Sequence, residues 1–330
     1  MLLVTGGAGY VGSHTLRALK ERGEKLVVLD DLSEGHESAV SGASLVRADL
    51  AEPSVGRVLD EIFSRGRFDA VLHFGAKAYV GESVRDPEKY YRNNVTGGVH
   101  LLAAMGRNRV SALIFSSTCA IYGSPERVPI PEDHPQNPIN PYGRTKLAFE
   151  GALKDFEGAA GIRHVNLRYF NAAGAHESGD LGEDHRPETH LIPLAIEAAM
   201  GKGEELPVFG DDYDTPDGTC IRDYIHVQDL AVAHVASLDR LRRGGSSASY
   251  NLGTGTGHSV LEVIERVSKV SGRKVPHRVV ARRPGDPARL VASAERARDE
   301  LGFAPRFRDL DRIVETAWHF KERFPDGYPD

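Results

Sequence analysis

The sequence is poor in several features that mark specialised protein classes. It has only two cysteines in 330 residues, Cys119 and Cys220, which are too few and too unpatterned for a disulfide framework or a cysteine metal site. We therefore expect reduced thiols and no bound metal. No stretch approaches the roughly 20 consecutive apolar residues that cross a bilayer, and the N-terminus MLLVTGGAGY lacks the basic start and apolar middle of a signal peptide. The net charge of -6 argues against a nucleic-acid partner. Together these absences predict a cytoplasmic protein that binds neither membrane nor nucleic acid.

What is present is a regular alternation of short β-branched runs with longer helical patterns, which is typical of βαβ units. Strands are expected at 2–5, 25–30, 44–49, 69–75, 112–117 and 162–170, and helices at 10–22, 54–65, 87–106 and 141–158. After residue 170 the rhythm breaks into Gly- and Pro-rich connections, with helices expected near 191–201, 227–242, 259–271 and 309–322.

This pattern predicts an α/β fold, a Rossmann-type doubly wound parallel sheet with a smaller α/β C-terminal substrate lobe. We place the dinucleotide-binding domain at 1–170 and the substrate lobe mainly at 171–330. That boundary is approximate, and segments can be exchanged across it.

A glycine-rich segment, TGGAGYVG, lies between the first expected strand and helix. It spaces Gly6, Gly9 and Gly12 so that the chain can turn tightly and a pyrophosphate can approach the helix N-terminus. A plain tight turn would explain the glycines alone. However, Asp30 ends the second strand, where a carboxylate can bind both ribose hydroxyls of an adenosine. Because Asp30 and Asp31 would repel a 2′-phosphate, NAD is favoured over NADP.

Tyr142 and Lys146 are four residues apart in NPYGRTKLAFE and therefore lie on one face of a helix. Asn140 and Pro141 suit the start of that helix. A tyrosine is a poor base at pH 7, because its ordinary pKa is about 10. A nearby ammonium and a positive nicotinamide ring both favour the phenolate, and we expect them to bring the pKa of Tyr142 toward the working range. Thr118, at the end of the fifth strand, can share a hydrogen bond with a substrate hydroxyl.

At this point the sequence resembles the extended short-chain dehydrogenase/reductase superfamily, and within it the UDP-glucose (UDP-galactose) 4-epimerases. The resemblance covers essentially the whole chain. Its carriers are TGGAGYVGSH, VLHFGAKAYVGES, YYRNNVTG, FSSTCAIYG, PYGRTK, LRYFNAAGAHESGDLGED, FGDDYDTPDGTCIRDYIHVQDLA, YNLGTGTGHSVLEV and RRPGD. It implies transient oxidation at carbon 4 of a UDP-hexose, a 4-keto intermediate, and NAD that stays bound. It also implies a homodimer through the helices near 87–106 and 141–158.

The resemblance assigns residues to the two ligands. Its catalytic residues are Tyr142, Lys146 and Thr118. Its cofactor residues are Gly6, Gly9, Tyr10, Val11, Gly12, Asp30, Asp31, Asp49, Leu50, Phe74, Gly75, Asn93, Ser116, Tyr142, Lys146 and Tyr169. Its substrate residues are Thr118, Tyr142, Asn171, Leu191, Phe209, Arg222, Tyr224, Arg283, Asp286 and Leu290. Asp49 could reach the adenine amino group or simply cap a strand end.

The chain departs from its relatives at several positions. Related dehydratases carry an Asp-Glu pair directly after the threonine. This chain has Cys119 and Ala120 there, and neither can serve as the carboxyl acid that dehydration needs. Cys119 could act as a thiol acid or base, or be a small packed residue. His190 replaces an asparagine of some relatives, and Ala78 replaces a cofactor-binding lysine, with Lys77 adjacent.

Three questions stay open from the sequence. Leu290 stands where relatives restricted to glucose and galactose commonly have a tyrosine, so either the sugar pocket accepts N-acetyl groups or the loop is rearranged. The enzyme could instead be an epimerase or a dehydrogenase of another nucleotide sugar. A catalytically silent NAD-binding scaffold is the remaining alternative.

Overall fold

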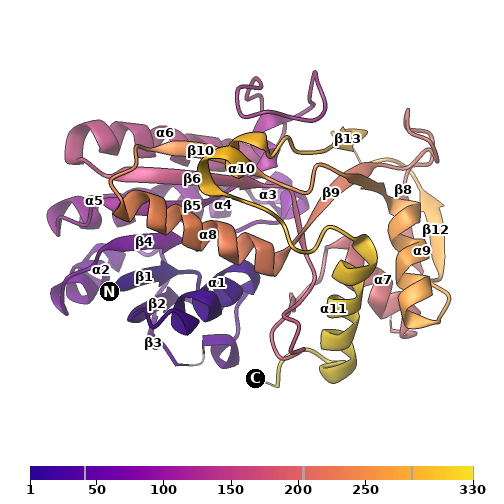
Figure 1. Cartoon of the computed structure of the whole chain (residues 1–330), viewed down its shortest axis with the longest axis horizontal. Helices are drawn as coiled ribbons and strands as arrows, with labels where there is room; N and C mark the ends of the chain where they lie inside the picture. Colours follow the sequence, from indigo (N-terminus) through magenta and orange to yellow (C-terminus); the bar gives the residue numbers. More distant parts are fainter. Residues whose placement is uncertain (41, 203–204, 284, 330) are drawn as a thin grey trace.

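The computed structural model describes residues 1–40, 42–202, 205–283 and 285–329. Its centre is a seven-stranded sheet in the order β10-β6-β5-β4-β1-β2-β3, in which every neighbouring pair is parallel (Figure 1). The strands are β1 (Leu2–Thr5), β2 (Leu26–Asp30), β3 (Ser44–Arg47), β4 (Ala70–His73), β5 (Ala112–Thr118), β6 (Arg163–Tyr169) and β10 (Ala248–Leu252). The strand order reverses beside β1, as it does in doubly wound sheets, so the predicted fold class is confirmed.

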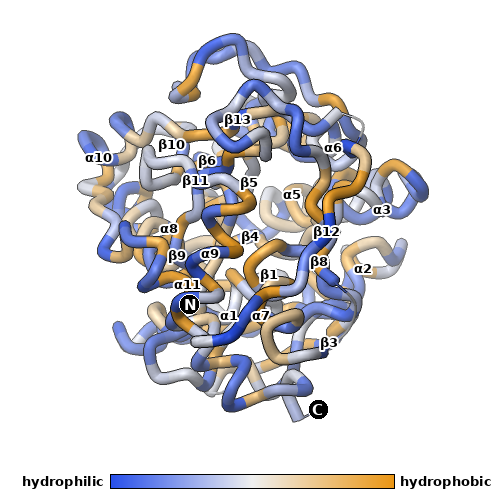
Figure 2. The backbone as a smooth tube through the Cα atoms, turned by 90° about the vertical axis from the view of Figure 1, so that its right-hand side faces the viewer, coloured by the Kyte–Doolittle hydropathy of each residue, from blue (hydrophilic) through white to orange (hydrophobic). Residues whose placement is uncertain are grey.

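Helices cover both faces of this sheet because alternate strand residues point to opposite sides. One face packs against α1 (Tyr10–Glu21) and α8 (Val227–Arg242), and its core contains Val4 and Ile114. The other face packs against α2 (Val55–Ser64), α5 (Gly98–Arg107) and α6 (Pro141–Ala160). In the rotated view the apolar strands lie in the interior and the hydrophilic segments at the periphery (Figure 2).

The large sheet takes part of its structure from beyond residue 170. Strand β10 pairs with β6, from Ala248 opposite Val165 to Leu252 opposite Tyr169. Helix α8, which is also distant in sequence, lies against α1 and is seen beside it in Figure 1. The N-terminal sheet is therefore completed by residues from the C-terminal half.

The expected helix at 87–106 is divided in the structure. It consists of α4 (Pro87–Tyr90), a π-helical segment (Tyr91–Gly97) and α5. It is preceded by α3 (Val80–Arg85), which the sequence did not predict. Side chains have no room at Gly97 and Gly98: a Cβ on Gly97 would lie 2.8 Å from the Leu50 oxygen, and one on Gly98 would lie 2.4 Å from the Phe149 ring. The π-helical segment is thus packed closely between Leu50, which follows β3, and α6. Such π-helical turns are frequently found at functional sites.

The smaller lobe is built from short strands and helices around its own core. Strands β7 (Asn171–Ala173), β9 (Ile221–His226), β11 (Gly257–Ser259) and β13 (Arg289–Leu290) form one sheet, and β8 (Leu206–Phe209) pairs with β12 (His277–Val280). The lobe also contains α7 (Leu191–Ala199), α9 (Val260–Ser271) and α11 (Leu310–Arg323). Helix α10 (Glu295–Leu301) packs near β10, and short 3₁₀ turns occupy Glu37–Val40 and Cys119–Tyr122.

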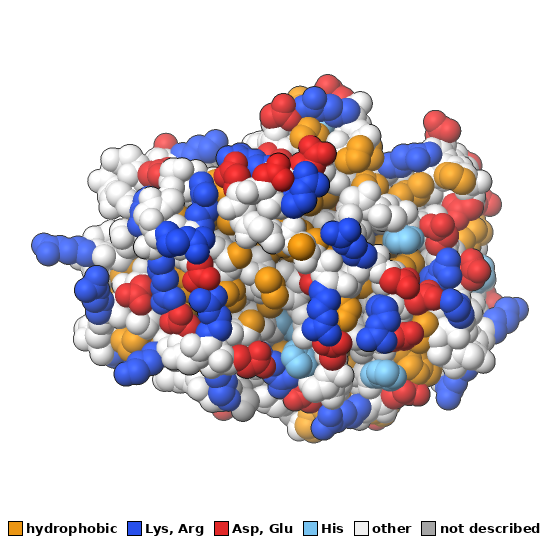
Figure 3. Space-filling model, viewed as in Figure 1, with side chains coloured by type: hydrophobic (Ala, Val, Ile, Leu, Met, Phe, Trp, Pro, Cys, Tyr) orange, Lys and Arg blue, Asp and Glu red, His pale blue; other side chains and the backbone are white. Residues whose placement is uncertain are grey.

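The surface carries both signs of charge. On the face shown in Figure 3, basic and acidic side chains are interspersed over both lobes. Within the described part of the chain, no helix combines the length and the apolar character needed to span a membrane.

Candidate active site

The three glycines of the turn after β1, Gly6, Gly9 and Gly12, differ in the space around them. Gly6 has a positive φ of 69°, and a Cβ there would lie 2.5 Å from the Gly75 nitrogen. A Cβ on Gly12 would lie 2.1 Å from the Gly6 oxygen, so these two residues must be glycine for the turn to pack between α1 and the segment that follows β4. At Gly9, which caps α1, a Cβ would meet only the Gly6 oxygen at 3.5 Å. The side of the turn at Gly9 therefore leaves room for a phosphate at the helix N-terminus.

The end of β2 holds two carboxylates in different environments. The Asp30 carboxylate accepts the amides of Ala8 and Leu32, both at 2.9 Å, and burial raises its pKa. Burial would also raise the pKa of Asp31, but hydrogen bonds from Ser33 and the ammonium of Lys77 lower it overall. Lys77 Nζ lies 3.6 Å from the Asp31 carboxylate. Lys77 thus lies beside the carboxylates at the end of β2, although Ala78 occupies the position of the family lysine.

The ends of β3, β4 and the π-helical segment converge on the same edge of the sheet. Asp49 accepts the Ala51 amide at 2.7 Å, which is the contact of a strand-end cap. A Cβ on Gly75 would lie 2.8 Å from the Leu50 side chain, so Leu50 packs directly on this turn. Asn93 donates to the Gly75 carbonyl at 3.4 Å.

Three further cofactor candidates lie around this edge. The Phe74 ring packs on His234, with centroids 4.6 Å apart. The Tyr10 hydroxyl donates to the Gly174 carbonyl at 2.5 Å, and Val11 packs against the core. The structure thus gathers these candidates at the carboxyl edge of the large sheet.

Helix α6 positions the catalytic pair. Asn140 caps the helix by accepting the Gly143 amide at 2.8 Å, and Pro141 occupies the first turn. Lys146 is buried, and its Nζ donates to the Ser116 carbonyl at 2.7 Å. The same Nζ lies 5.9 Å from the centroid of the half-buried Tyr142 ring. The Ser116 hydroxyl also bonds the hydroxyl of Tyr169, which joins the end of β5 to the end of β6.

Burial shifts the pKa values of both members of this pair. Burial lowers the pKa of Lys146 to about 7, although the Glu150 carboxylate opposes the shift. Burial raises the pKa of Tyr142 above its ordinary value, and a hydrogen bond with Thr118 offsets only part of the rise. The expected lowering of the Tyr142 pKa depends on the positive nicotinamide ring as well as on Lys146, and it stays a prediction. The Lys146 ammonium donates to the Ser116 carbonyl and not to the phenol.

Cys119, directly after Thr118, is 8% exposed and packs with Ile121, Ile130 and Phe170. Burial raises the pKa of its thiol to about 12. A thiol with that pKa is fully protonated at neutral pH, which makes it a poor acid or base. Leu290 packs against the same cluster and so lies close to the end of β5.

The second lobe presents the two candidate arginines on adjacent segments. Arg222, on β9, forms an ion pair with Asp286 and is opposite Leu290 in the β9–β13 register. The Arg283 guanidinium lies 4.3 Å from the centroid of the Phe209 ring. These residues therefore form one cluster, although they are separated by up to 81 positions in the sequence.

The remaining substrate candidates, Asn171, Leu191 and Tyr224, are buried or half-buried. Asn171 is opposite Tyr224 in the β7–β9 register, but Tyr224 is only 4% exposed and belongs to the core of the smaller lobe. Leu191, the first residue of α7, packs against that core as well. Both side chains thus contribute to packing.

A buried polar network beneath the catalytic helix was missed by the sequence reasoning. Glu150 forms an ion pair with Arg168 at 2.6 Å and accepts the Ser117 hydroxyl at 2.6 Å. Arg168 also donates to the Tyr122 hydroxyl at 3.0 Å, and both charged side chains are fully interior. The available signal was Arg168 between the apolar residues Leu167 and Tyr169, near the end of the strand IRHVNLRYF. Because Ser117 precedes Thr118, this network fixes the strand end that carries the threonine.

Comparison with known proteins agrees with this geometry. Residues 2–253 match the NAD dependent epimerase/dehydratase family. The chain belongs to that family, and its turn at Gly9 and its buried Asp30 fit an NAD molecule. A UDP-glucose 4-epimerase of Halalkalibacterium halodurans is 49% identical over 327 residues, covering 99% of this chain and 97% of the relative.

Two solved structures that resemble this chain are also UDP-glucose 4-epimerases. A UDP-glucose 4-epimerase from Brucella ovis in complex with NAD is 52% identical, with a TM-score of 0.93, and covers 97% of this chain and 98% of that one. One from Bifidobacterium longum in complex with NAD+ and UDP is 38% identical, with a TM-score of 0.93 and 99% coverage of both chains. Within the family, the chain belongs to the UDP-glucose 4-epimerases. The predictions of an epimerase and of NAD as its cofactor are confirmed.

Proposed function

We propose that this chain interconverts UDP-glucose and UDP-galactose, with Tyr142 as the base that removes the proton from the 4-hydroxyl. The observation that carries the proposal is the convergence of Tyr142, Lys146 and Ser116 at the carboxyl end of β5, on the same edge of the parallel sheet as the glycine turn. The buried ammonium lies 5.9 Å from the phenol ring, a distance over which it can stabilise a phenolate in a site of low dielectric constant.

The residues of the large sheet hold the cofactor in this proposal. The helix N-terminus at Gly9 takes the pyrophosphate, and Asp30 accepts the ribose hydroxyls. Lys146 binds the nicotinamide ribose and also stabilises the phenolate. NAD held by these residues would supply the acceptor and then the donor of a hydride at carbon 4 of the sugar.

Thr118 shares a hydrogen bond with the 4-hydroxyl of the sugar, and this bond orients the hydroxyl toward Tyr142. After oxidation, Tyr142 holds the proton beside the 4-keto oxygen and gives it back when the alcohol forms again. The keto sugar rotates about its bond to the diphosphate between these two steps. This requires that the sugar be bound loosely and the diphosphate tightly.

The arginines of the second lobe suit the diphosphate. Their planar guanidinium groups give permanently charged, bidentate contacts to phosphate oxygens. Arg222 and Arg283 stand on segments that meet at Asp286, and we assign both to the diphosphate and Asp286 to the uridine ribose. The Phe209 ring provides an apolar wall beside the uracil.

The range of accepted sugars depends on Leu290 in this proposal. Its side chain packs with Cys119 near the end of β5, so a tyrosine there would extend into the space beside the sugar. We expect wild type to act on UDP-GlcNAc as well as UDP-glucose. We expect Leu290→Tyr to lose most of the activity on the acetylated sugar and to keep that on UDP-glucose. If wild type leaves UDP-GlcNAc unchanged, the loop is rearranged and the proposal of broad specificity is wrong.

The direct test is incubation of the purified chain with UDP-galactose, and separately with UDP-GalNAc, without added NAD. Products are identified by NMR, with Tyr142→Phe as the inactive control. Appearance of UDP-glucose without an exogenous cofactor supports the proposal. Net accumulation of NADH would instead indicate a nucleotide-sugar dehydrogenase, and the absence of any turnover would indicate a silent scaffold.

Two further predictions concern the context of the enzyme. We expect a homodimer that pairs through the π-helical segment, α5 and α6, which can be checked by sedimentation. We also expect a cytoplasmic location, in keeping with two unpaired cysteines that are both buried.

A further inference from the structure

The segment between β7 and α7 contains a short sequence repeat that the epimerase chemistry does not use. Glu183 and His185 are followed, after two residues, by Glu188 and His190, which gives the pattern Glu-x-His-x-x-Glu-x-His. The repeat contains no cysteine, so the expectation of no bound metal, which rested on the low cysteine content, does not bear on it. Carboxylates and imidazoles are ordinary ligands of Zn²⁺.

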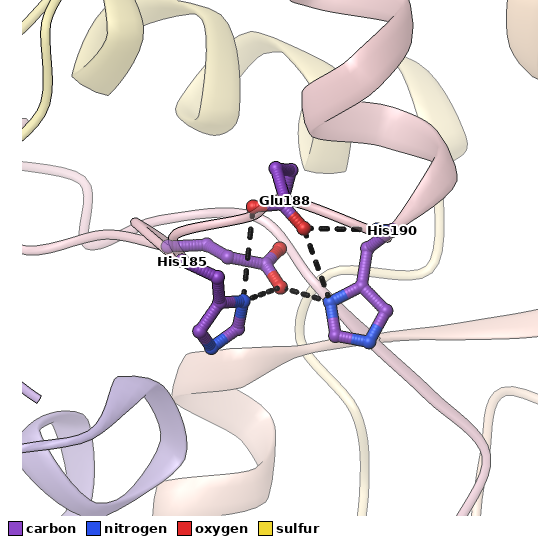
Figure 4. Close-up of side chains that lie close together, drawn as sticks. His185, Glu188 and His190 are labelled. Atoms are coloured by element: carbon purple, nitrogen blue, oxygen red, sulfur yellow. Dashed lines mark hydrogen bonds and ion pairs between the residues drawn. The ribbon is translucent and has the colours of Figure 1, made fainter. Parts of the chain in front are cut away.

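The fold brings all four side chains together (Figure 4). One ligand atom from each lies within 4.8 Å of all the others. His185 Nδ1 lies 3.3 Å from the nearer oxygen of Glu183 and 3.7 Å from Glu188 Oε2. His190 Nδ1 lies 3.6 Å from Glu188 Oε1 and also contacts Glu183.

The hydrogen bonding of the cluster is incomplete at its centre. The Glu188 side chain is only 5% exposed, and its Oε2 has no hydrogen-bond partner although it points toward His185. Its other oxygen, Oε1, accepts the amides of Thr189 and His190 at 2.7 and 2.9 Å, which fixes the orientation of the carboxylate. His185 Nδ1, likewise buried, also lacks a hydrogen bond. Buried polar atoms are rarely left unpaired, so two of them facing each other point to a missing ligand.

We propose that Glu183, His185, Glu188 and His190 form a binding site for one divalent transition-metal ion, with Zn²⁺ as the best match. Tetrahedral Zn²⁺ with bonds of about 2.0–2.2 Å separates its ligand atoms by about 3.3–3.6 Å. The separations of His185 Nδ1 from Glu183 and from Glu188 Oε2, 3.3 and 3.7 Å, are close to this range. The contact between His190 and Glu183 must open to admit the ion.

The chemistry of the four ligands favours this choice. Two neutral imidazoles and two carboxylates balance the charge of a divalent cation, and mixed nitrogen and oxygen ligands suit Zn²⁺ better than Ca²⁺ or Mg²⁺. The His190 side chain is 45% exposed, whereas those of Glu183 and Glu188 are 5% exposed. The ion therefore has an entry path past His190.

The position of the site suggests what the ion does. The His185 ring is flanked edge-on by the rings of Tyr10 and Tyr79, at centroid distances of 6.3 and 5.7 Å. Tyr10 is the first residue of α1, directly after the glycine turn, and also bonds Gly174 at the start of this segment. A bound ion would thus fix the connection between β7 and α7 against the cofactor turn. It takes no part in the epimerisation steps described above.

The test uses tag-free enzyme with its cofactor bound, because a histidine tag would itself bind zinc. After treatment with a chelator, the protein is titrated with Zn²⁺ by calorimetry at constant pH, and with Co²⁺ followed by visible absorption. We expect one ion per chain, the intense visible bands of four-coordinate Co²⁺, and a higher unfolding midpoint when zinc is bound.

Variants distinguish this site from others. His185→Gln and Glu188→Gln should each weaken Zn²⁺ binding by at least about tenfold, while circular dichroism and bound NAD confirm that they fold. The matched control is His258→Gln, which removes another histidine near a glutamate, Glu262 at 3.8 Å, outside the cluster. It should bind Zn²⁺ as wild type does. Absence of stoichiometric binding, or equal binding by His185→Gln and wild type, would overturn the proposal and leave the cluster as a set of histidine–carboxylate ion pairs.

Discussion

Replacing Lys146 by methionine removes a buried ammonium and leaves a side chain of similar length. The ammonium lies 5.9 Å from the centroid of the Tyr142 ring. With an effective dielectric constant of about 20, Coulomb's law gives about 2.8 kcal/mol for a unit charge and a phenolate at that separation. This energy corresponds to about two pKa units of Tyr142. The charge is present only below the pKa of Lys146, which burial lowers to about 7.

The assay is the pH dependence of kcat for UDP-galactose, measured on enzyme that retains its NAD. Tyr142 must lose its proton to act as a base, so removing the ammonium raises the pKa at which activity appears. We expect kcat of Lys146→Met to fall by about 100-fold below pH 7, where the wild-type ammonium is charged, and by less above it. Part of the activity should return at alkaline pH, because the phenol ionises there without help.

The matched control is Lys154→Met, two turns further along α6, where the lysine is exposed. It should leave both kcat and the pH profile unchanged. If Lys146→Met loses the same factor at every pH, the lysine acts only by holding the cofactor. If it keeps near-normal kcat at pH 7, the electrostatic reasoning is refuted.

Two other substitutions test the cofactor turn and the residue after Thr118. Gly12→Ala places a Cβ 2.1 Å from the Gly6 oxygen, so the purified protein should contain little NAD by absorbance and melt at a lower temperature. In the control, Gly151→Ala, the added Cβ on α6 meets nothing within 4 Å, and the free energy of unfolding measured in urea should rise by about 0.5–1 kcal/mol. Equal effects of the two substitutions would contradict the steric argument. Cys119→Ala should keep turnover within a few-fold in the same epimerase assay, since its buried thiol stays protonated. A loss as large as that of Tyr142→Phe would give the thiol a chemical role.

The large sheet was predictable because its strands are nearly continuous apolar runs between helical patterns. The strand at 112–117 was expected, for example, and β5 spans Ala112–Thr118. The strands of the smaller lobe were not predicted. Strand β13 has only two residues, and its pairing with β9 depends on distant segments meeting in space. The π-helical segment was also missed, because its periodicity differs little from that of an α-helix over seven residues.

The candidate site was predictable where spacing along one element carries the chemistry. Tyr142 and Lys146 share a helix face, and the glycines share one turn. The burial of these side chains could not be predicted from the sequence, because it depends on the whole fold. The raised pKa of Tyr142 and the proximity of Lys77 to Asp31 follow from tertiary packing, and no local pattern reveals them.

The central claim is that one hydrogen leaves carbon 4 and returns to the same carbon within a single active site. The most direct measurement uses UDP-galactose deuterated at carbon 4, enzyme without added NAD, and NMR of the UDP-glucose formed. We predict that the deuterium is retained at carbon 4 of the product, because the cofactor stays bound while the sugar turns. Loss of the label to water would contradict the account.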